Sequence, residues 1–192
     1  MRSRKPKKIT NRISSVTNGF VQAIIPISIP TVAETAEALA ILGMTPNTMS
    51  CVYCGTSVTD WDHLQPLVRG KRPSGYLHEA RNLVPSCGPC NQSKSGAHWR
   101  KWMLGKARGS PKTRGIQDLP RRIELLDSFE KWGNLSPLSF EEIIGREKWT
   151  QYWAALHEIE QKIRSAQLLA DEIQSSMKQG VAGLSGGNAS CR

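Results

Sequence analysis

The sequence has 192 residues, enough for one ordinary domain or for a small domain with an appendage. It contains no run of about 18 apolar residues, so its pattern excludes a transmembrane helix. The net charge is +10 and unevenly spread, because residues 51–115 contain eleven Lys/Arg and three Asp/Glu, whereas residues 116–192 contain nine and eleven. This concentration indicates a polyanionic partner, most simply nucleic acid, with a solvated basic surface as the alternative.

The five cysteines bear on the cellular compartment. Four of them stand at metal-ligand spacing, and Cys191 is left over. This usage favours a cytoplasmic protein over a secreted scaffold held by disulfides. The basic N-terminus followed by the apolar-leaning residues 20–30 weakly resembles a signal peptide, but Pro26 and Pro30 interrupt that stretch.

The N-terminal part is expected to be an arm followed by a short helix. Residues 1–30 read as a basic, largely irregular arm, with six Lys/Arg in the first twelve positions. Residues 31–42 are typical of a helix, because Thr31 and Glu34 form a capping box and Gly43 stands where a C-cap glycine belongs.

The middle of the chain, within residues 31–104, predicts a ββα unit. Its elements are a turn at Cys51 to Cys54, a strand over 61–67, a basic loop over 69–81, a strand over 82–85 and a helix over 87–104. Trp99 and Trp102 on this helix are expected in the core. The predicted fold class is therefore α+β, with mainly helical N- and C-terminal extensions.

The rest of the chain reads as a linker, a helical region and a tail. Residues 105–118 are a basic linker, residues 119–179 a helical region that Gly145 interrupts, and residues 180–192 a disordered Gly/Ser-rich tail. Apolar side chains recur at alternating spacings of four and three, at Tyr152, Leu156, Ile159, Ile163, Ala166, Ala170, Ile173 and Met177. Such a seam predicts either a coiled-coil dimer or a long helix that packs within its own chain.

The cysteine spacing predicts a structural zinc site. Cys51 and Cys54 form one CxxC pair, Cys87 and Cys90 form another, and 32 residues separate the pairs. Four thiolates make a closed tetrahedral site without an open position, which is typical of structural Zn²⁺. Because so small a unit buries little apolar surface, we expect the metal to stabilise its fold.

Three stretches within residues 51–100, CVYCG, WDHLQPL and NLVPSCGPCNQSK, resemble the HNH endonuclease family, whose fold is also called ββα-metal. The resemblance covers about a quarter of the chain. In that family an aspartate precedes the catalytic histidine, as Asp62 precedes His63 here, and the middle Asn of the motif falls on Asn82. The last motif position, His in the name-giving pattern, is Asn91, so the chain carries an HNN variant.

The resemblance implies a role for each motif residue. His63 is expected to be the general base, since a neutral histidine accepts a proton from water near pH 7. Asp62 and Asn91 offer oxygen ligands suited to a catalytic Mg²⁺ or Mn²⁺, and Asn82 is expected to fix the His63 region. Adjacent strand residues point to opposite faces, so Asp62 and His63 share a site only if the strand bends or the phosphate crosses its edge.

Each of these residues also has a structural alternative. His63 could be a buried or a surface histidine, Asn82 a turn cap and Asn91 a helix N-cap. His78, in the basic loop, is expected at the surface, although it is the only plausible rival base nearby.

The predicted function is a metal-dependent endonuclease of double-stranded DNA, resembling restriction or defence nucleases, that leaves 5′-phosphate and 3′-hydroxyl ends. Alternatives are a nicking, homing or partner-recruited nuclease and a zinc-ribbon DNA-binding module without activity. Cleavage of a palindrome would call for a two-fold homodimer. The expected DNA contacts are Arg69, Lys71, Arg72, Arg81, Lys94, Lys112 and Arg114.

Overall fold

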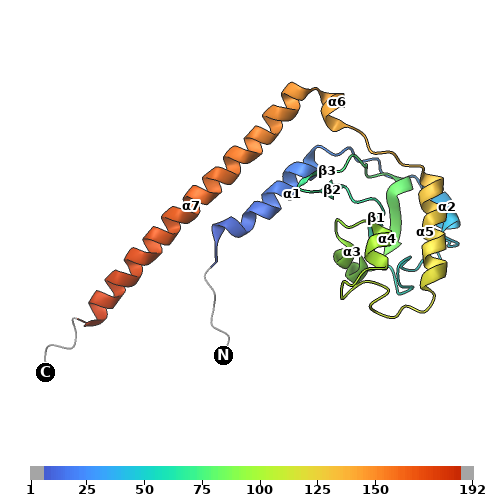
Figure 1. Ribbon diagram of the computed structural model, residues 1–192, viewed down its shortest axis with the longest axis horizontal. Coiled ribbons are helices and arrows are strands. Elements are labelled where there is room, and N and C mark those ends of the chain that lie inside the picture. Colours follow the sequence, from blue (N-terminus) through green and yellow to red (C-terminus); the bar gives the residue numbers. More distant parts are fainter. Residues whose placement is uncertain (1–6, 187–192) are drawn as a thin grey trace. The chain divides into compact units, whose positions relative to one another are not determined.

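A computed structural model of the chain, described over residues 7–186, has a mainly helical α+β fold with two small antiparallel sheets (Figure 1). This confirms the predicted fold class. The chain divides into two compact units, one of residues 21–143 and one of residues 1–20 with 144–192. No helix among the described residues is long and apolar enough to cross a bilayer.

The unit of residues 21–143 contains the cysteine pairs and all the motif residues. Its helices are α2 (Val32–Ile41), η2 (Ala80–Asn82), α3 (Gly88–Lys94), α4 (Trp99–Met103) and α5 (Leu119–Gly133). Its strands are β1 (Asp60–His63), β2 (Val68–Arg69), β3 (Arg72–Pro73) and β4 (Leu83–Ser86).

Helix α2 begins and ends as the sequence predicts. The Oγ1 atom of Thr31 accepts a hydrogen bond from the Glu34 amide, and the Glu34 carboxylate accepts one from the Thr31 amide. This capping box satisfies two of the amides that a helix N-terminus otherwise leaves unpaired. Gly43 follows the helix with a φ of 67°, a left-handed conformation that favours glycine.

Strands β1 and β4 form the sheet that holds the motif. They pair antiparallel, with Asp60 opposite Ser86 and His63 opposite Leu83. Along β1, Trp61 and His63 lie on one face and Asp62 on the other, since side chains alternate along a strand. The expected loop between the strands contains structure of its own, the β2–β3 hairpin and the turn η2.

The single helix expected over residues 87–104 is wrong in one respect, because two helices stand there. Helix α3 ends at Lys94, and Ser95 adopts a φ of 47°, outside the helical region. Gly96 follows, and a new helix, α4, starts at Trp99. The predicted burial of Trp99 and Trp102 is confirmed.

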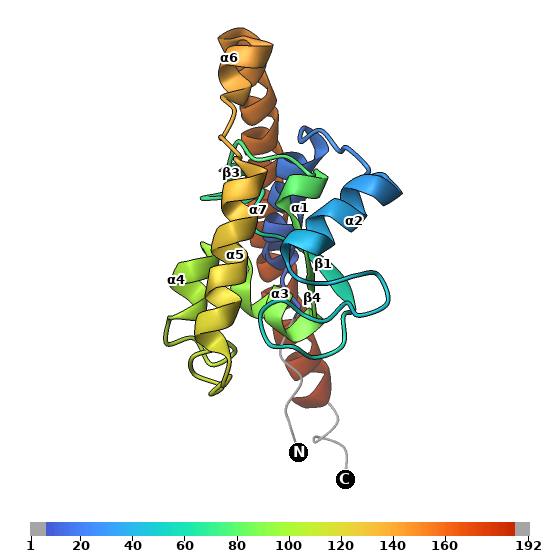
Figure 2. The same ribbon diagram turned by 90° about the vertical axis from the view of Figure 1, so that its right-hand side faces the viewer.

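The core of this unit surrounds the cysteines. It includes Tyr53, Leu64 and Val84 from the sheet region and Trp99 from α4. Helix α5, which the sequence assigned to a separate C-terminal region, contributes Leu126 and Phe129 to the same core. It also contacts α2 (Figure 2), where Trp132 Nε1 donates a hydrogen bond to Glu37.

The second unit consists of η1 (Ile9–Arg12), most of α1 (Ile13–Ala23) and α7 (Arg146–Gly186), which follows α6 (Phe140–Ile144) and Gly145. The prediction of an irregular arm over residues 1–30 is wrong for residues 9–23, which are helical. A helical arm becomes stable because it packs on α7. Thr17 donates a hydrogen bond to Glu160, Tyr152 to the carbonyl of Phe20, and the Ile9 amide to Gln167.

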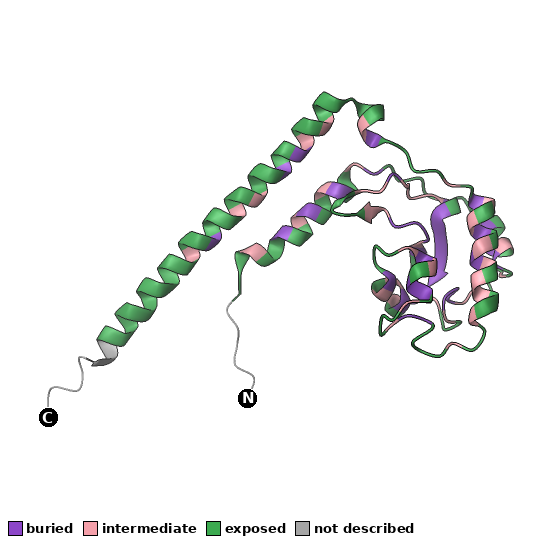
Figure 3. Cartoon of the chain, in the orientation of Figure 1, coloured by how far each residue is buried: buried purple, intermediate pink, exposed green. Residues whose placement is uncertain are grey.

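Helix α7 extends beyond the end predicted for it. Residues 180–186 are helical, although the sequence predicted a disordered tail from residue 180; within a formed helix each added residue gains a backbone hydrogen bond. Leu156 of the predicted seam is buried, whereas Ile173 and Met177 are 55% and 62% exposed. Most of α7 is coloured as exposed in Figure 3. The predictions for residues 1–6 and 187–192 lie outside the described residues.

Candidate functional site

The four cysteines of the two pairs gather at one point of the 21–143 unit. Their Sγ atoms all lie within 4.8 Å of one another, and none of the four is in a disulfide. The Cys54 and Cys87 sulfurs are 3.7 Å apart. A tetrahedron with metal–sulfur bonds of about 2.3 Å has edges of roughly 3.8 Å, so the cluster fits Zn²⁺.

Backbone turns and neighbouring arginines shape this cluster. The Gly55 amide donates a hydrogen bond to the Cys51 carbonyl at 2.7 Å, which closes the first knuckle. The Nη1 atom of Arg114 donates to Cys90 Sγ at 3.2 Å, and that of Arg122 to the Cys51 carbonyl at 3.1 Å. A hydrogen bond from the Cys90 thiol lowers the pKa of Cys51 to about 4, which favours the thiolate that a metal needs.

Asp62 is buried on the face of β1 that meets α3. Its Oδ2 atom accepts a hydrogen bond from Tyr53 at 2.7 Å and lies 3.1 Å from the Nζ atom of Lys94. Lys94 Nζ also donates to Asp62 Oδ1 at 3.3 Å and to the His63 carbonyl at 2.7 Å. Burial raises the pKa of Asp62 and lowers that of Lys94, although each charge favours the ionised form of the other.

His63 faces away from Asp62 and pairs with His78. Its Nε2 atom lies 3.0 Å from Nδ1 of His78, and the rings meet edge to face. Burial, together with His78 and Lys94, lowers the pKa of His63 to about 4. His63 is therefore neutral at pH 7, the form that can accept a proton, but the same lowered pKa makes it a weaker base than an ordinary histidine.

His78 was expected at the surface, but it is half-buried and held in place. Residue Ile27 forms an isolated parallel β-bridge with it, and the Ser28 amide donates to its carbonyl at 2.8 Å. The sequence signal that could have found this pair is weak, because the histidines stand fifteen residues apart, on either side of the β2–β3 hairpin.

Asn82 fixes the chain that follows His63. Its Oδ1 accepts a hydrogen bond from the Gln65 amide at 2.8 Å, and its Nδ2 donates to the carbonyls of Gln65 and Leu77 at 3.0 Å. The Leu64 amide donates to the Asn82 carbonyl at 2.8 Å. The side-chain amide and the carbonyl of this fully buried residue thus hold Leu64 and Gln65, next to His63, and the bond to Leu77 holds the residue before His78.

Asn91 lies half-buried on α3, one turn before Lys94. Among the described residues, its side-chain amide has no hydrogen-bond partner. Asp62, the other expected ligand of Mg²⁺ or Mn²⁺, is buried and has both oxygens engaged by Tyr53 and Lys94. As they stand, Asp62 and Asn91 do not form an open pair of oxygen ligands, so these residues do not fit a divalent cation in this arrangement.

The expected DNA contacts fall into three groups. Five are exposed without contact to the cysteine cluster: Arg69, Lys71 and Arg72 on the β2–β3 hairpin, Arg81 and Lys112. Arg114 is exposed but bonded to Cys90. Lys94 is only 1% exposed, so its assignment as a phosphate contact is corrected: the ammonium compensates the buried Asp62 instead.

No family model matches the chain, and neither a curated protein nor a solved structure matches it.

Proposed function

We propose that this chain is an endonuclease of the HNH type that hydrolyses phosphodiester bonds of double-stranded DNA. One observation carries the proposal: a neutral histidine, His63, stands at the end of a β-strand in the unit that holds the zinc-type cysteine cluster. Lys94 holds its carbonyl, and Asn82 holds the backbone of the two residues that follow it. The resemblance to HNH nucleases supports the same reaction.

The chemistry assigned to the chain's own residues begins at His63. Its imidazole accepts a proton from a water molecule, the water oxygen bonds to phosphorus, and the bond from phosphorus to the 3′ oxygen breaks. The leaving oxygen takes up a proton from solvent water, which gives 5′-phosphate and 3′-hydroxyl ends. The exposed basic side chains of the β2–β3 hairpin, Arg69, Lys71 and Arg72, are proposed to hold the DNA backbone.

A requirement for Mg²⁺ or Mn²⁺ stays a prediction from the resemblance. No contact described above supports it, because Lys94 occupies the Asp62 carboxylate. We assign no step of the reaction to such an ion.

The ion pair of Asp62 with Lys94 favours a second candidate, a zinc-dependent DNA-binding module without activity. If the buried Asp62–Lys94 pair never opens, the chain keeps its basic surface and its zinc fold but lacks the cation that nucleases of this type use. The restriction or defence role, and any nicking or partner-recruited mode, belong to the first candidate.

The decisive experiment is cleavage of supercoiled plasmid and phage DNA by the purified chain with Mg²⁺, with Mn²⁺ and with EDTA. The test variant is His63→Ala, and the matched control is His157→Ala, an exposed histidine on α7. Cleavage that His63→Ala loses and His157→Ala keeps supports the nuclease. Salt-sensitive binding without cleavage under any condition supports the binding module instead.

A further inference from the structure

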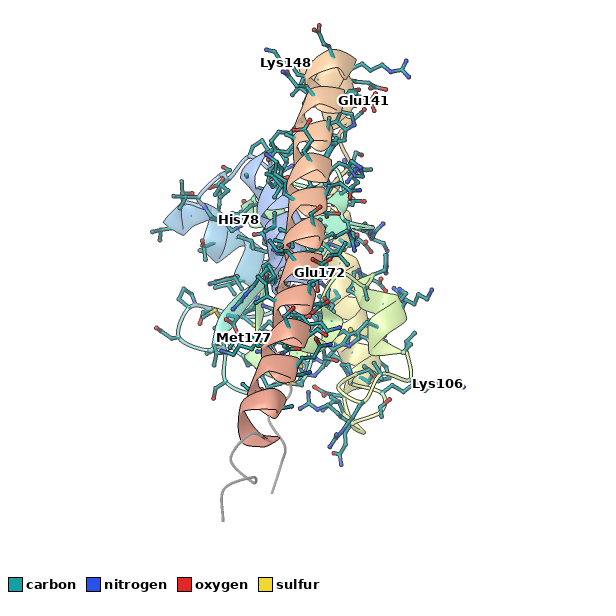
Figure 4. All side chains as sticks on the ribbon, turned by 90° about the vertical axis from the view of Figure 1, so that its left-hand side faces the viewer. His78, Lys106, Glu141, Lys148, Glu172 and Met177 are labelled. Carbon is teal, nitrogen blue, oxygen red and sulfur yellow. The ribbon has the colours of Figure 1, made fainter. Side chains whose placement is uncertain are left out.

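A cavity of about 300 Å³ lies in the 21–143 unit beside the histidine pair. It is lined by Pro30, Thr35, Ala38, Trp61, His78, Ala80 and Leu83. Its size is at the lower end of ligand pockets, which span roughly 300–1,000 Å³. Figure 4 labels His78 among the side chains of this part of the molecule.

The cavity has walls that suit a flat, uncharged group. The Trp61 side chain stands on β1 and is 38% exposed, so part of its ring is open to a ligand. The lining contains no Asp, Glu, Lys or Arg, so it offers nothing to neutralise a phosphate. The polar groups on the lining are Thr35 and His78, and the Thr35 hydroxyl already donates to the Thr31 carbonyl at 2.9 Å.

The position of the cavity links it to the proposed reaction. His78 both lines the cavity and lies 3.0 Å from His63. Trp61 is on the same face of β1 as His63, two residues before it. A group held in the cavity is therefore next to the side chain that is proposed to activate water.

From these features we infer that the cavity binds a nucleobase of the DNA, stacked on Trp61, next to the bond that is cut. This inference rests on the proposed function. A base is planar and uncharged, and stacking on an aromatic side chain contributes about 1–3 kcal/mol per base. Polar edges of the base can meet Thr35 and His78, which fix its orientation.

A base inside a duplex is stacked on both sides, so it must leave the stack to enter the cavity. That displacement costs a few kcal/mol in paired DNA and least for a mismatched or unpaired base. The chain should consequently prefer DNA with a locally unpaired nucleotide over a perfect duplex.

The test measures equilibrium binding by fluorescence anisotropy in a His63→Asn background, which prevents cleavage. The probes are a labelled perfect duplex and the same duplex with one mismatched pair. We expect tighter binding of the mismatched duplex, roughly tenfold weaker binding of it by Trp61→Ala, and retention of the preference by Trp61→Phe. Val32→Ala, an exposed apolar residue that does not line the cavity, is the matched control.

A second measurement needs no variant at Trp61. The indole N–H resonance of Trp61 is followed by NMR while a single-stranded oligonucleotide is added, and it should shift as the base stacks. Equal affinity for the two duplexes, or an unmoved Trp61 resonance, overturns the inference and leaves the nuclease proposal standing if the wild-type chain cleaves DNA. Absence of any DNA binding overturns both.

Discussion

The ammonium of Lys94 lies 3.1 Å from a carboxylate oxygen of Asp62, and both side chains are buried. The sequence suggested different partners for each, a phosphate for Lys94 and a divalent cation for Asp62. The contact joins α3 to β1 and also fixes the carbonyl of His63. It therefore links the stability of the unit to the geometry of the proposed catalytic strand.

Removal of one member of this pair should be costly. In Lys94→Met the Asp62 carboxylate keeps the Tyr53 hydroxyl and the His63 backbone as hydrogen-bond partners but loses its counter-charge, and an uncompensated buried charge costs about 3–5 kcal/mol. Urea unfolding measures the loss, with Lys101→Met, an exposed lysine on α4, as the control. Adding Asp62→Asn to Lys94→Met should restore part of the stability. A Lys94→Met loss no larger than that of the control would contradict the buried pair.

Zinc should be required for the fold of the 21–143 unit. The Sγ atoms sit amid the core residues Tyr53, Val84 and Trp99, so repulsion between unmetallated thiolates would act inside the core. We expect one zinc per chain by metal analysis, and a cooperative loss of near-ultraviolet circular dichroism on chelation. Cys90→Ser should reproduce that loss, whereas Cys191→Ser, at the cysteine outside the two pairs, should not. A folded, metal-free Cys90→Ser chain would disprove the requirement.

Asn82→Ala should reduce both stability and any cleavage. It removes three side-chain hydrogen bonds and leaves the Gln65 amide buried without its acceptor, which costs roughly 3 kcal/mol. Asn82→Asp keeps an acceptor for the Gln65 amide but buries a carboxylate against the carbonyls of Gln65 and Leu77, so its loss should exceed that of Asn82→Ala. Chemical unfolding of the two variants gives the order, and an Asp variant more stable than the Ala variant would refute this account.

The stability of the chain should fall in acid through His63. Its folded pKa of about 4 is below the unfolded value of about 6.5. Above pH 7 His63 is neutral in both states, so its titration does not reduce the free energy of unfolding. Between pH 6.5 and about 4 the unfolded chain takes up a proton that the folded chain excludes, and a few kcal/mol are lost.

His63→Asn should flatten this part of the profile, and His157→Asn should leave it unchanged. The measurement is the free energy of unfolding at intervals between pH 4 and 8. Identical pH slopes for His63→Asn and the wild-type chain would show that His63 titrates normally in the folded state.

Local signals in the sequence accounted for what depends on neighbouring residues. The capping box of Thr31 and Glu34 and the knuckles of the CxxC pairs are set within four residues, so spacing alone predicted them. The break of the helix at Ser95 was missed because a left-handed serine is rare and has no composition signal.

Long-range pairing accounts for the remaining differences. Lys94 bonds to Asp62, which stands 32 positions earlier in the chain. The sequence near Lys94 does not contain this partner, so it could not predict that the lysine is buried. Helix α1 is stabilised through contacts such as Thr17 with Glu160, 143 positions away, which no local pattern of residues 1–30 contains. His78 is held near His63 by two contacts, the hydrogen bond from Asn82 to the Leu77 carbonyl and the β-bridge between His78 and Ile27.

The homodimer stays a prediction, and α7 is where it can be tested. Beyond Gln167, the last residue bonded to η1, the side chains of Leu169, Ile173 and Met177 are each more than half exposed (Figure 4 labels Met177). They follow one another at spacings of four, so they form one ridge, and ridges of this kind pack against those of a second helix. The ridge is flanked by both acidic and basic side chains, including Glu172 and Lys178, so like-charge repulsion does not oppose self-association.

Sedimentation equilibrium over a range of concentrations measures this association. Ile173→Glu places a charge within the ridge and should shift the dimer towards monomer by at least tenfold in dissociation constant, since burying an unpaired charge costs several kcal/mol. Ser175→Glu, the same charge on the opposite side of α7, is the control. Because the ridge is short, the dimer should be weak and concentration-dependent. If the wild-type chain is monomeric at every concentration, the homodimer prediction is wrong, and cleavage by a two-fold dimer is excluded with it.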